Sequence, residues 1–186
     1  MGMAVPRFYT ADMVRALNEA EPRHWPRYET VHGELLVSPA PRPWHQVVAS
    51  RLHIALGIYL QREPVGEAFM SPSEISWGLP DIYVQPDVFV VPVEQLRTLE
   101  WKNFRLLLAA EALSPSTSRA DRTTKCRLYQ EQRVPLYWII DADAETVAEW
   151  TPEAREGRIE RETLIWHPRG ASTPFTLALE ALFRPV

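Results

Sequence analysis

Two acidic residues stand within otherwise apolar segments of this sequence. Asp87 is followed by the apolar residues 88–91, and Glu111 ends the apolar run of residues 106–110. A carboxylate buried without a partner is costly, so each one requires a cation, a metal ion or hydrogen bonds. If the two segments are neighbouring strands, the carboxylates repel one another unless a divalent cation lies between them. Oxygen ligands of this kind suit Mg²⁺ or Mn²⁺, which we expect as the cofactor.

Lys125 is the third candidate. It lies in the helix predicted to follow Glu111, and it shares a helix face with Tyr129, four residues further on. A lysine beside a metal-bound water can stabilise hydroxide or the charge that builds up on a phosphate. An alternative stays open, in which the acidic residues are solvent-exposed strand ends and Glu111 and Lys125 form a structural ion pair.

The elements that must position these residues form a mixed series of helices and strands. The clearest is a helix over residues 43–62, with apolar residues at helical spacing after a proline-rich entry. The remaining patterns predict a helix over 10–20, two strands over 28–39 around a turn at His32-Gly33, strands over 67–77 and 83–92, a connection over 93–103, a strand over 104–115, a helix over 118–133, strands over 135–143, 146–153 and 160–168, and a tail that forms a strand or a helix. This order favours a single α/β (α+β) domain over residues 1–186.

Composition indicates an ordinary folded domain. The chain has 186 residues, of which 46% are hydrophobic and 24% charged. Its net charge of −4 weighs mildly against nucleic-acid binding, although a bound cation would offset an acidic metal site. The single cysteine, Cys126, excludes an intrachain disulfide and fits a reducing compartment. The sequence has no apparent signal peptide and no apolar run of membrane-spanning length, so we expect a cytoplasmic protein without membrane partners.

Short motifs along the chain support a more specific reading. They are Tyr28-Glu29, Gly33-Glu34-Leu35, SPAP at 38–41, His45, VQPD at 84–87, EALSPST at 111–117, Asp121, Lys125, Tyr129, Pro135 and YWIID at 137–141. Each motif alone is weak, but their joint order resembles the Uma-two family of restriction-endonuclease-like proteins over residues 28–150.

The resemblance implies a PD-(D/E)XK fold, in which a mixed sheet carries helices on both sides. The core would cover about residues 28–150, with C-terminal strands over 151–186. Asp87 and Glu111 would be metal ligands. The sequence departs from the E-x-K pattern of the superfamily, since the expected lysine position holds Leu113. The resemblance suggests that the lysine has moved to the next helix, as Lys125.

Several further residues are candidates for accessory roles, Glu34 among them because it matches the family motif. Glu34 is a possible metal or water ligand, with a solvent-facing hairpin glutamate as the alternative. Glu29 and Glu74 are weaker candidates, and Glu74 stands where family members usually carry aspartate. His45 would have a helix-start or site-edge role. Further accessory candidates are Tyr129 beside the site, and Arg119 and Arg122 as contacts to flanking phosphates.

The sequence therefore predicts a metal-dependent endonuclease that hydrolyses phosphodiester bonds in nucleic acid, with DNA as the expected substrate. The rival interpretation is an inactive nuclease-fold module that binds nucleic acid or a protein. A third is a metal-dependent hydrolase of a small phosphate ester, which a pocket rather than a long groove would favour. The five histidines lack zinc-site spacing and no G-x-S-x-G motif is present. Strand edges and seven tryptophans lead us to expect a homodimer.

Overall fold

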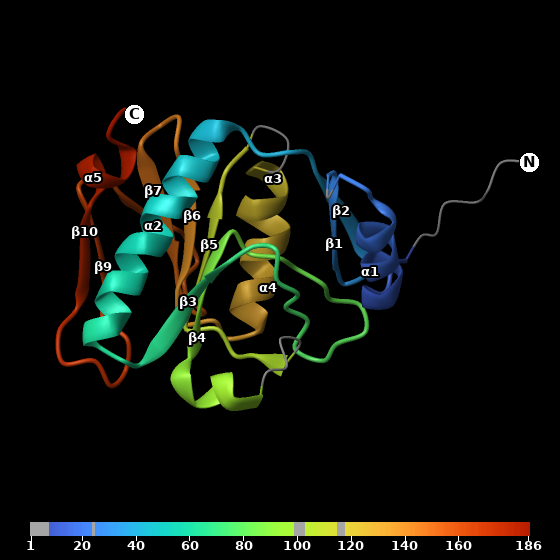
Figure 1. Cartoon of the computed structure of the whole chain (residues 1–186), viewed down its shortest axis with the longest axis horizontal. Coiled ribbons are helices and arrows are strands. Elements are labelled where there is room, and N and C mark those ends of the chain that lie inside the picture. The colour runs from blue at the N-terminus through green and yellow to red at the C-terminus, as the bar shows by residue number, and fades with distance from the viewer. Residues whose placement is uncertain (1–7, 24, 99–102, 115–117) are drawn as a thin grey trace, which may run out of the picture.

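A six-stranded mixed sheet forms the centre of the molecule (Figure 1). The computed structural model describes residues 8–23, 25–98, 103–114 and 118–186. The strands lie side by side in chain order, with β5 and β6 parallel and all other neighbours antiparallel. Their bounds are β3 Gly66–Met70, β4 Val88–Pro92, β5 Leu108–Ala112, β6 Tyr137–Asp141, β7 Thr146–Trp150 and β8 Arg158–Glu160.

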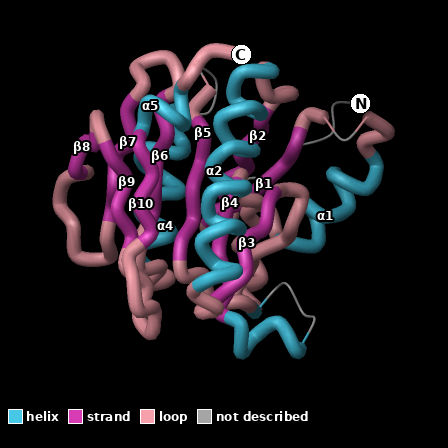
Figure 2. The backbone as a smooth tube through the Cα atoms, turned by 60° about the vertical axis from the view of Figure 1, so that its left-hand side comes forward, coloured by secondary structure: helices cyan, strands magenta, loops and turns pink. Residues whose placement is uncertain are grey.

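The long helix α2 (Pro43–Arg62) covers one face of this sheet (Figure 2). A second sheet of β9 (Thr163–Trp166) and β10 (Phe175–Ala178), followed by α5 (Leu179–Phe183), completes the same core. That core is apolar, because alternate residues of the central strands point toward α2 and all of them are hydrophobic.

The opposite face packs against a continuous helical segment. It starts as α3 (Ser118–Ala120), widens into a π-helical turn, η3 (Asp121–Lys125), and continues as α4 (Cys126–Glu131). Burial of this segment forms a second hydrophobic cluster with the other set of alternate strand residues. Helices therefore cover both faces, as the fold prediction required.

A small N-terminal unit lies at the other end of the molecule from β9 and β10 (Figure 1). It contains α1 (Ala11–Ala20) and the hairpin of β1 (Arg27–Val31) and β2 (Glu34–Ser38), which turns at His32 and Gly33 with positive φ. Thr10 caps α1 by accepting a hydrogen bond from the Met13 amide, as predicted. An isolated bridge between Thr30 and Tyr83 ties this hairpin to the segment that leads into β4.

Most predicted elements are present, and the helix over 43–62 has the predicted bounds at both ends. The strand predicted over residues 83–92 is wrong in its first half, since β4 begins only at Val88 and the chain before it makes isolated bridges. Pro86 lacks the amide donor that a continuous ladder needs. Beyond β7, strand β8 was not predicted, and the tail forms both a strand and a helix. The 3₁₀ helix η1 (Val93–Thr98) lies in the predicted connection.

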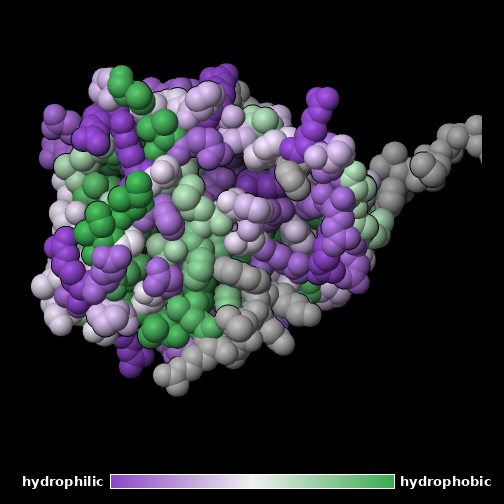
Figure 3. All heavy atoms as spheres, in the orientation of Figure 1, coloured by the Kyte–Doolittle hydropathy of each residue, from purple (hydrophilic) through white to green (hydrophobic). Residues whose placement is uncertain are grey.

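The molecular surface is uneven in polarity. In the view of Figure 3 hydrophobic residues gather on the left half, whereas the region of α1 on the right is mostly hydrophilic. α2 contributes the exposed side chains of Ile54 and Ile58. Among the helices that the structure describes, none combines the length and apolar character needed to cross a bilayer.

Candidate active site

The register of β4 and β5 sets Asp87 and Glu111 opposite one another. Val88 pairs with Ala110 in this antiparallel ladder, so Asp87, which directly precedes β4, comes opposite Glu111, which follows Ala110 in β5. The Ala112 amide donates a 2.9 Å hydrogen bond to Oδ2 of Asp87, which fixes the carboxylate at the strand edge. Glu111 is almost fully buried, while the side chain of Asp87 is 26% exposed. The structure thus brings the two predicted carboxylates together.

Lys125 lies against Glu111, as the relocated-lysine interpretation requires. Its Nζ is 2.9 Å from Oε1 of Glu111, 2.8 Å from Oε2 of Glu29 and 3.5 Å from Oδ1 of Asp121. The hydroxyl of Tyr129 donates a 3.2 Å hydrogen bond to the same Oε1 of Glu111. Lys125 is therefore surrounded by three carboxylates and is itself buried.

The π-helical turn η3 contributes two of the residues that meet here. Asp121 and Lys125 stand at its two ends, and both side chains are buried toward the sheet. Turns of this kind are rare and occur frequently at functional sites, because they alter which side chains share a face. The hydroxyl of Tyr137 donates to the Asp121 carbonyl at 3.0 Å and so helps to hold the turn against β6.

The cluster carries excess negative charge. Four carboxylates face two cations, which leaves a net charge of −2 when all six groups are ionised. The carboxylates are Glu29, Asp87, Glu111 and Asp121, and the cations are Arg27 and Lys125.

The pKa shifts follow from this imbalance. Burial, together with the charges of Asp87, Asp121 and Glu29, raises the pKa of Glu111 well above its usual value, although Lys125 opposes the shift. Burial alone would also raise the pKa of Glu29, but Lys125 and Arg27 outweigh it and lower that pKa. Burial would lower the pKa of Lys125, yet its three carboxylate neighbours raise it. Within one cluster the pKa of Glu111 is thus raised and that of Glu29 is lowered, while the pKa of Lys125 is raised.

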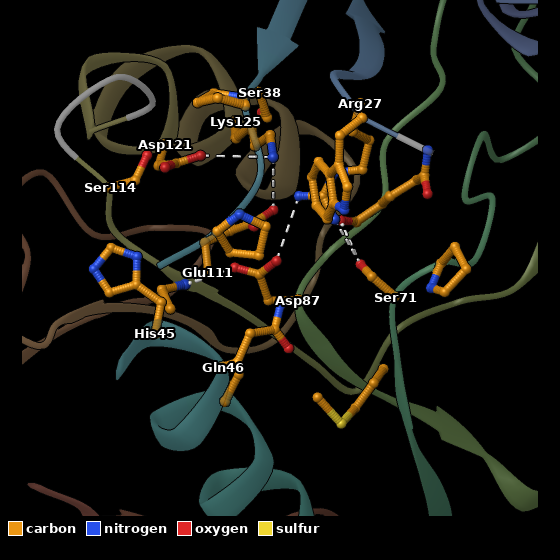
Figure 4. Close-up of a pocket in the computed structure, with 18 of the residues that line it drawn as sticks. Arg27, Ser38, His45, Gln46, Ser71, Asp87, Glu111, Ser114, Asp121 and Lys125 are labelled. Carbon is orange, nitrogen blue, oxygen red and sulfur yellow. Dashed lines mark hydrogen bonds and ion pairs between the residues drawn. The ribbon is translucent and has the colours of Figure 1, made fainter. Parts of the chain in front are cut away.

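The cluster opens into a cavity of about 390 Å³, a volume in the range of ordinary ligand sites. Figure 4 shows Arg27 and Lys125 directed toward the carboxylates of Asp87 and Glu111. The start of α2 supplies the wall on the other side, where His45 and Gln46 line the cavity. His45 is buried there, consistent with its predicted position at the site edge.

The donor set suits a hard divalent cation. Among the residues that the structure describes, no three His, Cys, Asp or Glu side chains form a ready-made metal-binding group. Mg²⁺ does not need one, since it usually keeps several waters and takes one or two carboxylates together with substrate phosphate. Asp87 and Glu111 provide such a pair of carboxylates beside a cavity. The residues present therefore fit Mg²⁺ or Mn²⁺ better than zinc.

Other predicted site residues lie outside the cavity. Glu34 is exposed at the start of β2, so the hairpin glutamate that reaches the cluster is Glu29 and not Glu34. Both carboxylate oxygens of Glu74 accept hydrogen bonds from Arg15, at 3.0 and 2.6 Å, away from the cavity lining. Arg122 is exposed and pairs with Asp141 at 2.9 Å.

Arg119 is exposed on α3 and also lies outside the cavity lining. From the sequence, Glu29 is only a weaker candidate, Asp121 is only one of the ordered motifs, and Arg27 is not a candidate. Arg27 and Glu29 are two apart on β1 and therefore point to the same side, but the strand predicted from the sequence began only at Tyr28 and so left Arg27 out. His24, Trp101 and the end of the EALSPST motif fall outside the described residues.

A family profile with the description "Uma2: Putative restriction endonuclease" matches residues 14–184, nearly the whole chain. This chain belongs to the Uma2 family. The family resemblance proposed from the sequence motifs is therefore confirmed.

A solved structure extends the likeness to the fold. The crystal structure of a "putative nuclease belonging to DUF820" from Anabaena variabilis ATCC 29413 superposes with a TM-score of 0.75 at 23% sequence identity, covering 94% of this chain and 97% of that one. At this identity the likeness establishes the shared fold. The chain therefore shares with that protein the mixed sheet with flanking helices, and the fold prediction is confirmed.

One curated protein matches a part of the sequence. It is the "Probable dipeptidyl-aminopeptidase B" of Colletotrichum graminicola, 27% identical over 128 residues, which are 64% of this chain. The match spans only 13% of that protein's length. A likeness over so small a share of the larger protein does not bear on the chemistry of the Uma2 cavity, which has no G-x-S-x-G nucleophile motif.

Proposed function

We propose that this Uma2 protein is a nuclease that uses Mg²⁺ or Mn²⁺ to hydrolyse phosphodiester bonds in DNA. One observation carries the proposal, namely the pair of facing carboxylates, Asp87 and Glu111, in a cluster whose six charged groups sum to −2 when all are ionised. A protein that buries such a pair without need would lose stability to repulsion and desolvation. A divalent cation would remove the excess charge and give both carboxylates a function.

Each residue of the cluster then has a distinct part in the reaction. Asp87 and Glu111 would hold the cation, which when bound polarises the phosphate and lowers the pKa of a coordinated water. Lys125 keeps its proton beside three carboxylates, so it suits the role of a positive charge near the phosphate better than that of a base. Tyr129 holds the carboxylate of Glu111 in place through its hydroxyl.

Nucleic acid is the substrate that the family description supports best, since restriction endonucleases cleave DNA. The net charge of −4 means that local groups at the cavity, not the whole surface, must attract the phosphate backbone. An arginine or lysine that lines the cavity is therefore the expected contact for a phosphate.

Two other functions remain to be separated by experiment. The tight enclosure of Lys125 by carboxylates also suits a binding module that has kept the cluster as a structural ion network. The compact cavity of about 390 Å³ also suits hydrolysis of a small phosphodiester.

The decisive experiment compares plasmid cleavage by the wild type, Asp87→Ala and Glu111→Ala in Mg²⁺, Mn²⁺ and chelator. Glu34→Ala serves as the control, because this glutamate is exposed and lies outside the cavity. We expect nicking or cutting that needs metal, disappears in both cavity variants and persists in the control. Activity that survives in either cavity variant would refute the proposal.

Calorimetric titration of Mn²⁺ into the same proteins distinguishes the alternatives. A folded wild type that neither cleaves DNA nor binds metal would establish the binding-module reading. Cleavage of a chromogenic phosphodiester with intact plasmid would instead identify a small-molecule hydrolase. Metal binding that both alanine variants abolish is the result expected of the nuclease.

A further inference from the structure

Arg27 is a buried arginine at the cavity wall whose hydrogen-bonding capacity is only partly used. It stands at the start of β1 with a side chain that is 12% exposed. Its Nη1 donates a 2.9 Å hydrogen bond to the hydroxyl of Ser71. Its Nε is buried and has no hydrogen-bond partner among the described residues. A buried donor without a partner costs free energy, so such an arrangement calls for a reason.

The contact between Arg27 and Asp87 is long for an ion pair. Nη2 of Arg27 lies 3.4 Å from Oδ1 of Asp87, whereas charge-assisted hydrogen bonds of this type are usually about 2.7–2.9 Å. By contrast, the Lys125 ammonium approaches Glu29 to 2.8 Å in the same cluster. Of the two buried cations, Lys125 is thus well paired, and Arg27 is held loosely at the edge of the cavity.

We propose that Arg27 is a phosphate-binding residue of this cavity, and that it takes up one backbone phosphate of the nucleic acid. The proposal rests on the proposed function and adds a residue that neither the family match nor the sequence motifs assign. A guanidinium presents a planar fork of donors that matches the oxygens of a phosphate, which an ammonium does not. The unpaired Nε and the loosely paired Nη2 belong to that fork.

Asp87 links this role to the metal site. The same carboxylate faces Glu111 across the strands and contacts Arg27, so it cannot serve a cation and the arginine fully at the same time. Engagement of Asp87 with a cation would weaken its hold on the guanidinium and leave the fork available to phosphate. The ring of Trp25, 5.7 Å from the guanidinium carbon, restricts the plane in which the fork can lie.

A purely electrostatic role is the competing explanation. Arg27 lies near the charges of Glu29, Asp87 and Glu111, and any cation at this position would offset them. In that case lysine would replace arginine without loss of DNA affinity. If the fork binds phosphate, lysine fails even though the charge is preserved, and the Arg27→Lys variant therefore separates the two explanations.

The test measures binding of a short fluorescein-labelled DNA by anisotropy, in Ca²⁺ and in chelator, because Ca²⁺ takes the same oxygen ligands. The proteins are the wild type, Arg27→Lys, Arg27→Gln and the matched control Arg133→Lys, whose arginine is exposed, pairs with Glu153 and lies outside the cavity. We expect both Arg27 variants to bind DNA about 10- to 100-fold more weakly in Ca²⁺. Their Ca²⁺ affinity should equal or exceed that of the wild type, and the control should bind DNA normally.

Several results would overturn the proposal. They are wild-type DNA affinity in Arg27→Lys, an equal loss in Arg133→Lys, and absence of DNA binding by the wild type in both buffers. A different result would separate the two proposals. If the wild type binds DNA but no metal, and the Arg27 variants bind DNA more weakly than the wild type, the role of Arg27 is supported and the metal-dependent function fails.

A measurement on the wild type avoids dependence on the folding of the variants. The Nε–H of Arg27 gives its own NMR signal, and its environment should change when a partner fills the empty donor position. We expect that signal to shift on addition of DNA or of inorganic phosphate. An unchanged signal at saturating DNA would overturn the proposal whatever the variants do.

Discussion

The two faces of the central sheet differ in polarity, although the same strands form both of them. Toward α2, the strand residues are all apolar, as Val88 and Val90 of β4 and Trp138 of β6 illustrate. Toward the η3 turn lie Asp87, which directly precedes β4, and Glu111 of β5. The difference arises from the alternation of side chains along a strand, so a shift of one residue in register would exchange the two faces.

The comparison shows which part of the molecule stabilises the fold and which part carries the chemistry. Burial of apolar area on the α2 face contributes favourable free energy with little specificity. The charged face costs desolvation, and its ion pairs do not repay that cost reliably. We therefore expect substitutions on the first face to change stability alone, and conservative substitutions on the second to change activity far more than stability.

The largest effect is expected for Glu111→Gln. Activity should fall about 10²- to 10³-fold, because a neutral amide is a poor metal ligand and cannot balance Lys125. Initial rates of plasmid cleavage in Mg²⁺ provide the measurement. A variant with more than a tenth of wild-type activity would contradict the assignment of Glu111 as a metal ligand.

The same variant should keep or gain stability at neutral pH when metal is absent. Burial and neighbouring carboxylates raise the pKa of Glu111 in the folded protein. The group therefore stabilises the fold fully below its unfolded pKa of about 4.3, and this contribution is lost as the pH rises toward the folded pKa. Glutamine does not titrate, so this pH dependence is absent from Glu111→Gln. The melting temperature of the variant minus that of the wild type should therefore increase with pH over this window. A difference that stays constant with pH would contradict the raised pKa.

On the apolar face, Leu52→Ala should lower the free energy of unfolding by about 2–5 kcal/mol, since it leaves a cavity under α2. Urea denaturation gives the value. Cleavage per folded molecule should be unchanged. Ile54→Ala is the matched control on the same helix, because its side chain is 56% exposed and its loss should cost no more than about 0.5 kcal/mol. A loss of cleavage activity in folded Leu52→Ala would contradict the expectation that substitutions on this face change stability alone.

A smaller effect is expected where the hairpin meets the cluster. Glu29→Gln should reduce kcat about 10- to 100-fold with little change in KM, because it removes one of three carboxylates that orient Lys125. Glu34→Gln changes the same type of residue on the other strand of the hairpin and should leave both constants unchanged. Steady-state kinetics on both variants settle which glutamate serves the site, and a larger effect from Glu34 would reverse the assignment.

The smallest effect is expected for Glu74→Gln, at the partly exposed ion pair with Arg15. Its loss should cost less than about 1 kcal/mol of stability and leave cleavage intact, because solvent screens the pair. Thermal unfolding and plasmid cleavage test the two statements. A marked loss of activity would show that the accessory role first assigned to Glu74 is correct after all.

Local patterns in the sequence were sufficient to predict much of this protein. Apolar periodicity and the prolines before residue 43 determined the bounds of α2, and His32-Gly33 determined the turn of the hairpin. The two carboxylates in apolar segments identified Asp87 and Glu111, because a buried charge is conspicuous without any knowledge of the fold. The family match then confirmed the family that the joint order of the motifs had indicated.

The composition of the cluster was decided only by the tertiary structure. Glu29 reaches Lys125, and Glu34 does not, because an isolated bridge from Thr30 to Tyr83 fixes how the hairpin sits beside the sheet. The antiparallel register of β4 and β5 sets Asp87 against Glu111, and the π-helical turn places Lys125 between them and the hairpin. Residues nearly a hundred positions apart meet here through pairing and packing, and no local preference of the chain encodes such distances.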